Sequence, residues 1–397
     1  MSLNDTPSSE RTHIAFFGMR NAGKSSLVNA VTGQQLSVVS DTLGTTTDPV
    51  KKTMEILPLG PVVIIDTPGY DDSGDLGRMR VKKAEEVLRN TDVAILVIDS
   101  NVGLKDKDKE FIKIFKANKI PYIVAFNKAD INTVPIKNKN EIAVSATKSI
   151  NIKELKELIG AIKPQKINRP ILSDIINAGD LIVLVIPIDE SAPKGRLILP
   201  QQLVMRDILD CNAIFCTCQT ESLKDLLLNL KVAPKLVITD SQAFKEVSDI
   251  VPKEIPLTSF SIIMARHKGE LEGYLNGAVA LNNLKDGDKV LISEGCTHHR
   301  QCKDIGSVKI PAMIKKFTNK EPSFYFTSGG EFPESTREYS LIVHCGGCML
   351  NATEMQNRIK IANENNTPII NYGMAIAEMN GILKRSLEPF NKKDLQE

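Results

Sequence analysis

The chain has 397 residues, 42% of them hydrophobic and 25% charged, and a formal net charge of +2 at pH 7. This length predicts two or three domains, and the small net charge argues against broad binding to nucleic acid or anionic membranes. The longest apolar runs, such as 181–188, are too short to span a bilayer. The short polar N-terminus lacks the apolar core of a signal peptide, so we expect a cytoplasmic protein. Its seven cysteines then favour metal ligands or thiols over disulfides.

Apolar strands alternate with helix-patterned segments through the first part of the chain. Strand-length apolar runs occupy 12–17, 62–66, 93–99 and 122–127, and each is followed by a loop and an amphipathic stretch. This alternation is typical of a doubly wound α/β domain. Residues 162–170 contain two prolines and few apolar side chains, and therefore predict a linker.

Two further α/β segments follow the linker. In the first, the apolar run at 181–188 predicts a strand buried on both faces, and Pro252 and Pro256 mark the end of the segment. The second segment begins at residue 257 and carries a part rich in cysteine and histidine. The expected architecture is α/β throughout, with three domains at 1–165, 166–256 and 257–397.

A glycine-rich loop, GMRNAGKS at 18–25, follows the first strand and opens a helical pattern. This context predicts a phosphate-binding loop, because glycines let backbone N–H groups approach phosphates and the next helix N-terminus favours negative charge. Lys24 is expected to reach the β- and γ-phosphate oxygens, and Ser25 to bind Mg²⁺. The loop residues expected to bind the nucleotide are Gly18, Asn21, Ala22, Gly23, Lys24, Ser25 and Ser26.

Motifs at three later strand ends decide which nucleotide is bound. Asp66 can hold the Mg²⁺ shell, and Gly69 can offer its N–H to the γ-phosphate. In the Asn-Lys-Ala-Asp motif at 127–130, the carboxylate accepts two hydrogen bonds that guanine donates and adenine cannot. GTP is therefore the expected nucleotide. The residues expected to bind its base are Asn127, Lys128, Asp130, Ser145 and Ala146.

These elements, in this order, resemble the translation-factor-like GTPases over the whole first domain. The segment 44–48, GTTTD, resembles the Gly-Thr-Thr-Arg-Asp switch of the TrmE–Era branch, which implies that Thr46 binds Mg²⁺. The resemblance also implies that Asn21 binds K⁺. Tyr70 stands where Ras-type enzymes carry a water-orienting glutamine, so GTP hydrolysis should be slow and K⁺-stimulated. The expected catalytic residues are Lys24, Thr46, Asp66 and Gly69.

Soft metal ligands gather near the end of the chain, in Cys296-Thr-His298 and His344-Cys345-Gly-Gly-Cys348. A Cys-x-x-Cys turn can bring two thiolates to one metal centre, and a third comes from a distant loop. Three cysteines suit a [4Fe–4S] cluster with one labile iron, whereas His298 or His344 would complete a Cys₃His zinc site. Redox-active or unligated thiols are the third alternative.

This cysteine and histidine pattern, behind a TrmE–Era-type GTPase domain, resembles the HydF family of [FeFe]-hydrogenase maturation GTPases. Segments 187–196 and 257–266 extend the resemblance through the middle of the chain. It implies a GTP-binding, a dimerisation and a cluster-binding domain, in that order, with a [4Fe–4S] cluster on Cys296, Cys345 and Cys348. The candidates for an exchangeable fourth ligand are Asp189, His298 and His344.

The resemblance further implies a scaffold that receives a diiron precursor made with two radical-SAM maturases and passes it to apo-[FeFe]-hydrogenase. We expect a homodimer or a larger homo-oligomer, with no nucleic-acid or membrane partner. The alternative is an RNA- or ribosome-associated TrmE–Era-type GTPase with a C-terminal zinc module. The sequence has no concentrated basic, aromatic-rich segment to favour that alternative.

Overall fold

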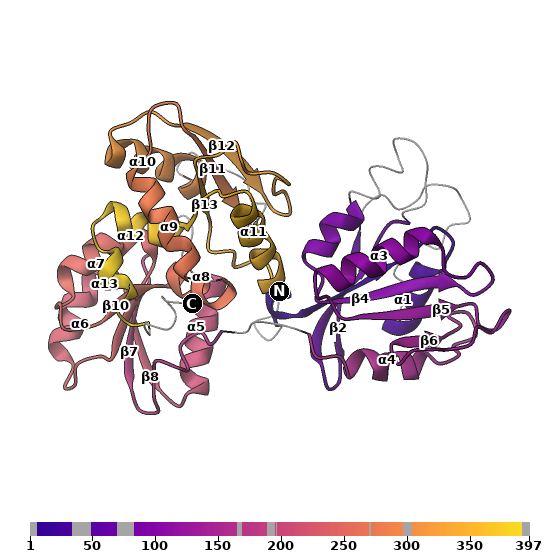
Figure 1. Ribbon diagram of the computed structural model, residues 1–397. Helices are drawn as coiled ribbons and strands as arrows, with labels where there is room; N and C mark the ends of the chain where they lie inside the picture. Colours follow the sequence, from indigo (N-terminus) through magenta and orange to yellow (C-terminus); the bar gives the residue numbers. More distant parts are fainter. Residues whose placement is uncertain are drawn as a thin grey trace. The chain divides into compact units, whose positions relative to one another are not determined.

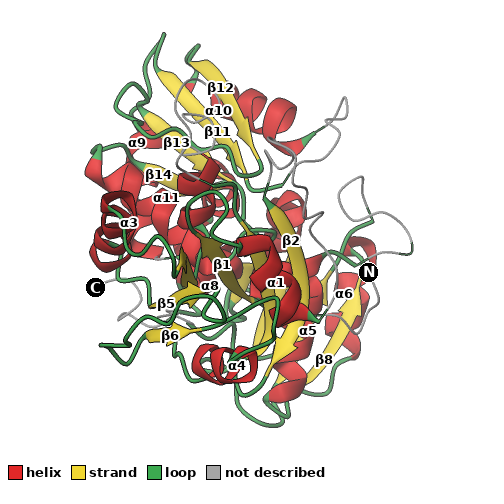
Figure 2. Ribbon diagram, turned by 90° about the vertical axis from the view of Figure 1, so that its right-hand side faces the viewer, coloured by secondary structure: helices red, strands yellow, loops and turns green. Residues whose placement is uncertain are grey.

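The computed structural model describes residues 6–33, 49–69, 83–164, 169–188, 195, 197–269, 271–296 and 304–390 (Figure 1). The chain divides into two compact units, Met1–Lys166 and Ile167–Glu397. Each unit is built on mainly parallel β-sheet packed against helices, which confirms the expected α/β class (Figure 2). Every helix in the described ranges is too short or too polar to cross a lipid bilayer.

The first unit contains a six-stranded sheet in the order β2-β3-β1-β4-β5-β6. All neighbouring strands are parallel except β2 and β3, which form an antiparallel pair. Successive side chains of β1 point to opposite faces, so Ile14 and Phe16 lie in one core and Ala15 and Phe17 in the other. The strands are β1 Thr12–Phe17, β2 Val50–Ile56, β3 Gly60–Asp66, β4 Val93–Asp99, β5 Tyr122–Asn127 and β6 Glu141–Ala143.

Helices cover both faces of this sheet (Figure 1). Helices α1 (Lys24–Thr32) and α4 (Ile152–Gly160) pack in one core, and α3 (Asp106–Ala117) packs in the other through Phe111 and Phe115. With the faces covered, the carboxyl ends of the parallel strands carry the loops, which is where open α/β sheets bind their ligands.

The second unit contains two four-stranded parallel sheets, in the orders β10-β9-β7-β8 and β12-β11-β13-β14. One hydrophobic core includes residues of both sheets. The strands are β7 Leu181–Val185, β8 Ile214–Cys218, β9 Leu236–Thr239, β10 Leu257–Ser259, β11 Lys289–Glu294, β12 Ser323–Ser328, β13 Leu341–His344 and β14 Ile369–Asn371. The helices are α5 Leu199–Asp210, α6 Leu223–Asn229, α7 Phe244–Ile250, α8 Phe260–Lys268, α9 Leu271–Asn282, α10 Ile310–Thr318, α11 Ala352–Glu364, α12 Tyr372–Met379 and α13 Leu383–Leu387.

The sheet of the middle segment extends past the expected limit at residue 256. Strand β10 lies beyond Pro256 and pairs with β9, so it completes that sheet. Pro252 and Pro256 lie between α7 and β10, where proline interrupts regular backbone hydrogen bonding without marking a linker. The division of the second unit into two domains at residues 256 and 257 stays a prediction.

Candidate nucleotide site and cysteine site

The predicted phosphate loop lies between β1 and α1, and its backbone requires glycine at two positions. A Cβ at Gly18 would lie 2.3 Å from the Val97 carbonyl oxygen. A Cβ at Gly23, whose φ is 84°, would lie 2.3 Å from the Asn127 side chain. These two glycines therefore let the loop fold closely over the ends of β4 and β5.

Lys24, Ser25 and Asp66 meet at this loop. The Lys24 Nζ donates hydrogen bonds to the Gly18 and Met19 carbonyl oxygens at 2.8 and 2.9 Å, so the ammonium lies within the loop. The Ser25 hydroxyl donates to Asp66 Oδ2 at 2.5 Å. A hydroxyl beside a carboxylate at this position is the pair of oxygens that holds Mg²⁺ in P-loop proteins.

Asn127 joins the phosphate loop to the predicted base-binding loop. Its Nδ2 donates to the Ala22 carbonyl oxygen at 3.0 Å, and its Oδ1 accepts the Ala146 N–H at 3.1 Å. Ser145 is fully buried in the same loop, whereas Asp130 is exposed. The backbone of the base-binding loop is thus fixed, and the Asp130 carboxylate is accessible to a guanine base.

Asp99 is a residue of this site that the sequence did not reveal. The Lys128 Nζ lies 2.6 Å from Asp99 Oδ2, and Asp99 is the register partner of Asn127 across β4 and β5. Burial alone would raise the pKa of Asp99, but hydrogen bonds from Lys128 and Asn101 outweigh it, so this pKa lies below its ordinary value. Its position at the end of a buried parallel strand was the available signal.

Some of the predicted nucleotide-site residues lie outside the described residues. They include Thr46, the predicted Mg²⁺ ligand, and Tyr70. Asn21, the predicted K⁺ ligand, is exposed and has a φ of 60°. Gly69 lies against the phosphate loop, because a Cβ there would be 2.9 Å from the Arg20 backbone nitrogen. The roles of these residues stay predictions.

The cysteines come from the carboxyl ends of two adjacent parallel strands. Cys296 follows β11, Cys345 follows β13, and the two strands pair with Ser293 opposite His344. From β11 the chain continues to β12 on one side of it, and β13 lies on the other side, so the strand order reverses between β11 and β13. Ligands of open α/β sheets bind at such a switch point.

Backbone hydrogen bonds connect Cys345 to the Cys296 segment. The Gly295 N–H donates to Cys345 Sγ at 3.1 Å, and the Gly347 N–H donates to the same sulfur at 3.4 Å. Burial raises the pKa of Cys345 to about 11. Burial also raises the pKa of Cys296 to about 12, and the charges of Cys345 and Cys348 add to this effect. These mutual effects indicate that the three cysteines lie near one another at the strand ends.

The donor type of this site, thiol sulfur, suits an iron–sulfur cluster. Partly buried thiols that would repel one another as anions lose their protons most readily when a metal ion takes the place of the protons, and thiolates are the ligands that such clusters take. The two N–H···S contacts are of the kind that tunes cluster thiolates. Within the part of the chain that the structure describes, no group of three or more His, Cys, Asp or Glu side chains is arranged to hold a metal ion. Cluster binding by these cysteines therefore stays a prediction.

A buried ammonium contacts the Cys-x-x-Cys turn. Lys268 is 1% exposed, and its Nζ donates to the carbonyl oxygens of Gly347, Cys348 and Leu350 at 3.3, 3.2 and 2.7 Å. Burial raises the pKa of the Cys348 thiol, and the Lys268 charge opposes part of that rise. Its partners here are backbone carbonyls, which every residue has, so the role of Lys268 cannot be predicted from a sequence motif.

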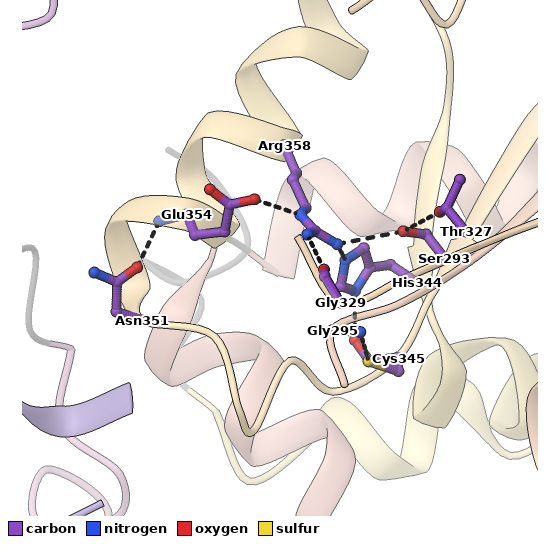
Figure 3. A network of polar contacts seen from close by, with 9 residues as sticks. All are labelled: Ser293, Gly295, Thr327, Gly329, His344, Cys345, Asn351, Glu354 and Arg358. Carbon is purple, nitrogen blue, oxygen red and sulfur yellow. Dashed lines mark hydrogen bonds and ion pairs between the residues drawn. The ribbon is translucent and has the colours of Figure 1, made fainter. Parts of the chain in front are cut away.

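His344, a predicted candidate for the fourth ligand, uses both ring nitrogens within the protein (Figure 3). Its Nδ1 lies 2.7 Å from the Cys345 carbonyl oxygen, and its Nε2 lies 3.0 Å from Arg358 Nη1. Burial, with the Arg358 charge, lowers the pKa of His344 to about 3, so the imidazole is neutral. Neither nitrogen is left for iron in this arrangement. The other candidates, Asp189 and His298, lie outside the described residues.

The first unit is similar to known GTPases: residues 13–128 match the family model described as 50S ribosome-binding GTPase. The tRNA modification GTPase MnmE of Desulforamulus reducens is 35% identical over 152 residues, which are 36% of this chain and 32% of that protein. GTPase Der of Kosmotoga olearia is 35% identical over 123 residues, 30% of this chain and 28% of that protein. The chain thus spans about a third of the length of these curated relatives. The solved structure of Aquifex aeolicus Era bound to GDP and aluminium fluoride is 20% identical, with a TM-score of 0.34, and the match covers 56% of this chain and 98% of that one.

The second unit matches two more specific family models. Residues 171–269 match the hydrogen maturase F dimerization domain, and residues 272–389 match its tetramerization domain. Together these two models match more than half of the chain. Fold and sites thus define a P-loop GTPase joined to an α/β unit of dimerisation and tetramerisation domains. The chain belongs to the hydrogen maturase F family.

Proposed function

We propose that this chain is a GTP-hydrolysing scaffold that holds a [4Fe–4S] cluster and carries a diiron precursor of the [FeFe]-hydrogenase active site. The observation that carries this proposal is the placement of Cys345 beside the Cys296 segment, at the switch point of the β12-β11-β13-β14 sheet. The hydrogen maturase F models over the second unit support the link to hydrogenase. The proposed partners are two radical-SAM maturases and apo-hydrogenase, in the cytoplasm.

In the first unit, the phosphate loop would hold GTP for attack by water. The Lys24 ammonium would exchange its two loop carbonyls for β- and γ-phosphate oxygens, where it opposes the negative charge that develops in the transition state. Ser25, Asp66 and Thr46 would hold Mg²⁺, which neutralises phosphate charge. Water adds to the γ-phosphorus, the bond to the bridging oxygen of GDP breaks, and GDP and phosphate leave.

The base of GTP would lie at the ends of β5 and β6. Asp130 is exposed there and would accept hydrogen bonds from the N1–H and the amino group of guanine. The Asn127 side chain bonds both to the Ala22 carbonyl oxygen of the phosphate loop and to the Ala146 N–H of the base-binding loop. One side chain therefore positions the loops that would contact the phosphates and the base. Adenine lacks the two adjacent donors and would leave the Asp130 carboxylate unsatisfied.

In the second unit, the cluster would be held by Cys296, Cys345 and Cys348. A [4Fe–4S] cluster held by three protein thiolates keeps one iron open to an exchangeable ligand, and a carrier of a diiron cargo requires this property. The N–H groups of Gly295 and Gly347 orient the Cys345 sulfur, and Lys268 holds the carbonyls of the turn. Asp189 and His298 are the proposed exchangeable ligands.

The oligomer would form through the second unit. The dimerisation and tetramerisation domain matches support a homo-oligomer. Each sheet ends in an edge strand with exposed apolar side chains, namely Ile214 on β8 and Tyr325 and Phe326 on β12. Edge strands of this kind favour pairing with another chain, and a second copy is the proposed partner.

GTP hydrolysis should depend on K⁺ bound at Asn21. We expect turnover at least about tenfold faster in KCl than in NaCl of equal concentration, because the ion adds positive charge where the transition state becomes more negative. Asn21→Gly should lose this stimulation, since glycine tolerates the φ of 60° but lacks the side-chain oxygen. The rate of phosphate release in each salt measures the effect.

A matched control is Asn151→Gly, because Asn151 has a φ of 55° in the same unit. The ratio of the KCl rate to the NaCl rate should stay at the wild-type value in this variant. A wild-type ratio of one, or a ratio that Asn21→Gly leaves unchanged, would contradict the proposed K⁺ site.

Anaerobic reconstitution tests the proposed function as a whole. Iron and sulfide should give a brown protein with about four iron atoms per chain, and reduction should weaken its visible absorbance and produce an EPR signal. The loaded protein, supplied with GTP and with cargo from the two maturases, should activate apo-hydrogenase. A colourless protein that binds zinc and RNA would instead support the alternative of an RNA-associated GTPase.

A further inference from the structure

A buried guanidinium joins the strand ends that lead to the cysteines. Arg358 lies on α11 and is 1% exposed. Its Nη1 lies 3.0 Å from His344 Nε2 at the end of β13 and 3.4 Å from Ser293 Oγ on β11, and its Nη2 donates to the Gly329 carbonyl oxygen at 2.6 Å after β12 (Figure 3). One side chain therefore connects three neighbouring strands, of which β11 leads to Cys296 and β13 to Cys345.

The contact with Arg358 fixes the tautomer of His344. Arginine has only donors, so Nε2 of His344 must accept its hydrogen bond and the ring proton must lie on Nδ1. That Nδ1–H then donates to the Cys345 carbonyl oxygen at 2.7 Å. The carbonyl of Cys345 is thus held by His344 while its sulfur accepts two backbone N–H groups. These contacts fix both the backbone and the thiol of one predicted ligand.

The position of Arg358 is itself held from the turn that follows the cysteines. Its Nε lies 2.9 Å from Glu354 Oε1, and Glu354 is buried. The N–H of Glu354 donates to Asn351 Oδ1 at 3.0 Å, which caps the N-terminus of α11. Asn351 lies three residues after Cys348, so α11 starts directly after the cysteine turn. Arg358, on this helix, contacts His344, which directly precedes Cys345 at the start of the same turn.

We propose that Arg358 is a positioning residue of the iron–sulfur site, acting through His344 and Ser293 to hold Cys345 and the Cys296 segment in place for a cluster. This inference rests on the proposed cluster function. A buried charge is costly, and here four of its contacts are to Glu354 and to the strand-end groups of Ser293, His344 and Gly329. The guanidinium also lies over the Phe332 ring, 5.1 Å from its centroid. Replacing a residue that hydrogen-bonds and orients a metal ligand commonly lowers metal affinity by about 10–100-fold.

Arg358→Lys is the first variant, because lysine keeps the charge but cannot form the planar fork that reaches His344, Ser293 and Gly329. After reconstitution, the Arg358→Lys variant should lose iron to a chelator about 10–100-fold faster than wild type, and its EPR line shape should change. The control is Arg385→Lys: this guanidinium of the same unit binds the carbonyl oxygens of Ser248, Val251, Pro252 and Ile255. Its iron release and EPR spectrum should match wild type.

Removing one partner of a buried ion pair can unfold a protein, so a second variant replaces both partners. Glu354→Leu with Arg358→Met leaves no unpaired charge and should fold, while still releasing iron faster than the control. If Arg358 acts through His344, Arg358→Lys should change iron release far less in a His344→Gln background than in wild type.

The outcomes separate this inference from the proposed function. A wild-type chain that retains no iron after reconstitution would refute the proposed function and this inference with it. A wild-type chain that holds iron, with Arg358→Lys and the double variant both releasing it at the Arg385→Lys rate, would overturn the inference alone. Fully additive effects of Arg358→Lys and His344→Gln would overturn the route through His344.

Discussion

Replacing Lys24 by alanine should reduce GTP turnover by about a hundredfold or more, because one charge-assisted contact to the transition state is lost. The Lys24 Nζ donates hydrogen bonds to the Gly18 and Met19 carbonyl oxygens at 2.8 and 2.9 Å, and these bonds place its charge inside the phosphate loop. The variant should still bind iron, because the cysteines belong to the second compact unit. Phosphate release, iron content and activation of apo-hydrogenase measure the three properties.

Lys153→Ala is the matched control, since Lys153 is a lysine of the same unit whose side chain is 86% exposed. It should keep wild-type GTP turnover and hydrogenase activation. If hydrolysis drives the exchange of partners, Lys24→Ala should load with cluster and cargo yet fail to activate the hydrogenase. Wild-type activation by Lys24→Ala would show that GTP hydrolysis is dispensable for the carrier function.

The nucleotide-binding unit could largely be predicted because each of its motifs ends an apolar strand. The expected strands at 12–17 and 122–127 have the observed bounds of β1 and β5, and the expected strand at 62–66 falls within β3, which begins at Gly60. Strand β2 was missed. It lies at the sheet edge with Lys51, Thr53 and Glu55 exposed, so its sequence lacks the apolar run of a buried strand.

The contacts behind the cysteines could not be predicted from the sequence. The cysteine spacing indicates which thiols converge, but Lys268 and Arg358 lie on helices where basic residues ordinarily face solvent. Both are buried, and their partners include backbone carbonyls, which carry no sequence signature. Its place beside Cys345 makes His344 a candidate fourth ligand, whereas in the structure its ring nitrogens contact Arg358 and a carbonyl oxygen.

The two sites obey the same topological rule. In the first sheet the strand order reverses between β1 and β4, and the phosphate loop follows β1. In the last sheet it reverses between β11 and β13, and each of these strands leads into a cysteine. At such a point the loops that follow two adjacent strands run to opposite sides of the sheet. A crevice therefore opens at the carboxyl ends of these strands, where side chains or backbone groups can bind a ligand. The chain therefore offers phosphate donors at one switch point and sulfur donors at another.

Replacing Cys345 by serine should abolish cluster binding and leave GTP turnover unchanged. A serine hydroxyl is not a soft donor and keeps its proton near neutral pH, so iron should fall from about four atoms per chain to well below one. The fold should survive, because serine Oγ can still accept the Gly295 and Gly347 N–H groups that bond to the sulfur. Iron analysis, visible absorbance and phosphate release measure the outcome.

Cys218→Ser is the control that separates ligand loss from a general effect of removing a partly buried thiol. Cys218 lies on β8 in the other sheet of the same unit, and burial raises its pKa to about 11, close to that of Cys345. Because Cys218 lies far along the chain from the cysteine turn and on a different sheet, its replacement should keep the brown colour and the full iron content. Full iron in Cys345→Ser would contradict thiolate ligation at this residue, whereas iron loss in both variants would point to damage of the unit as a whole.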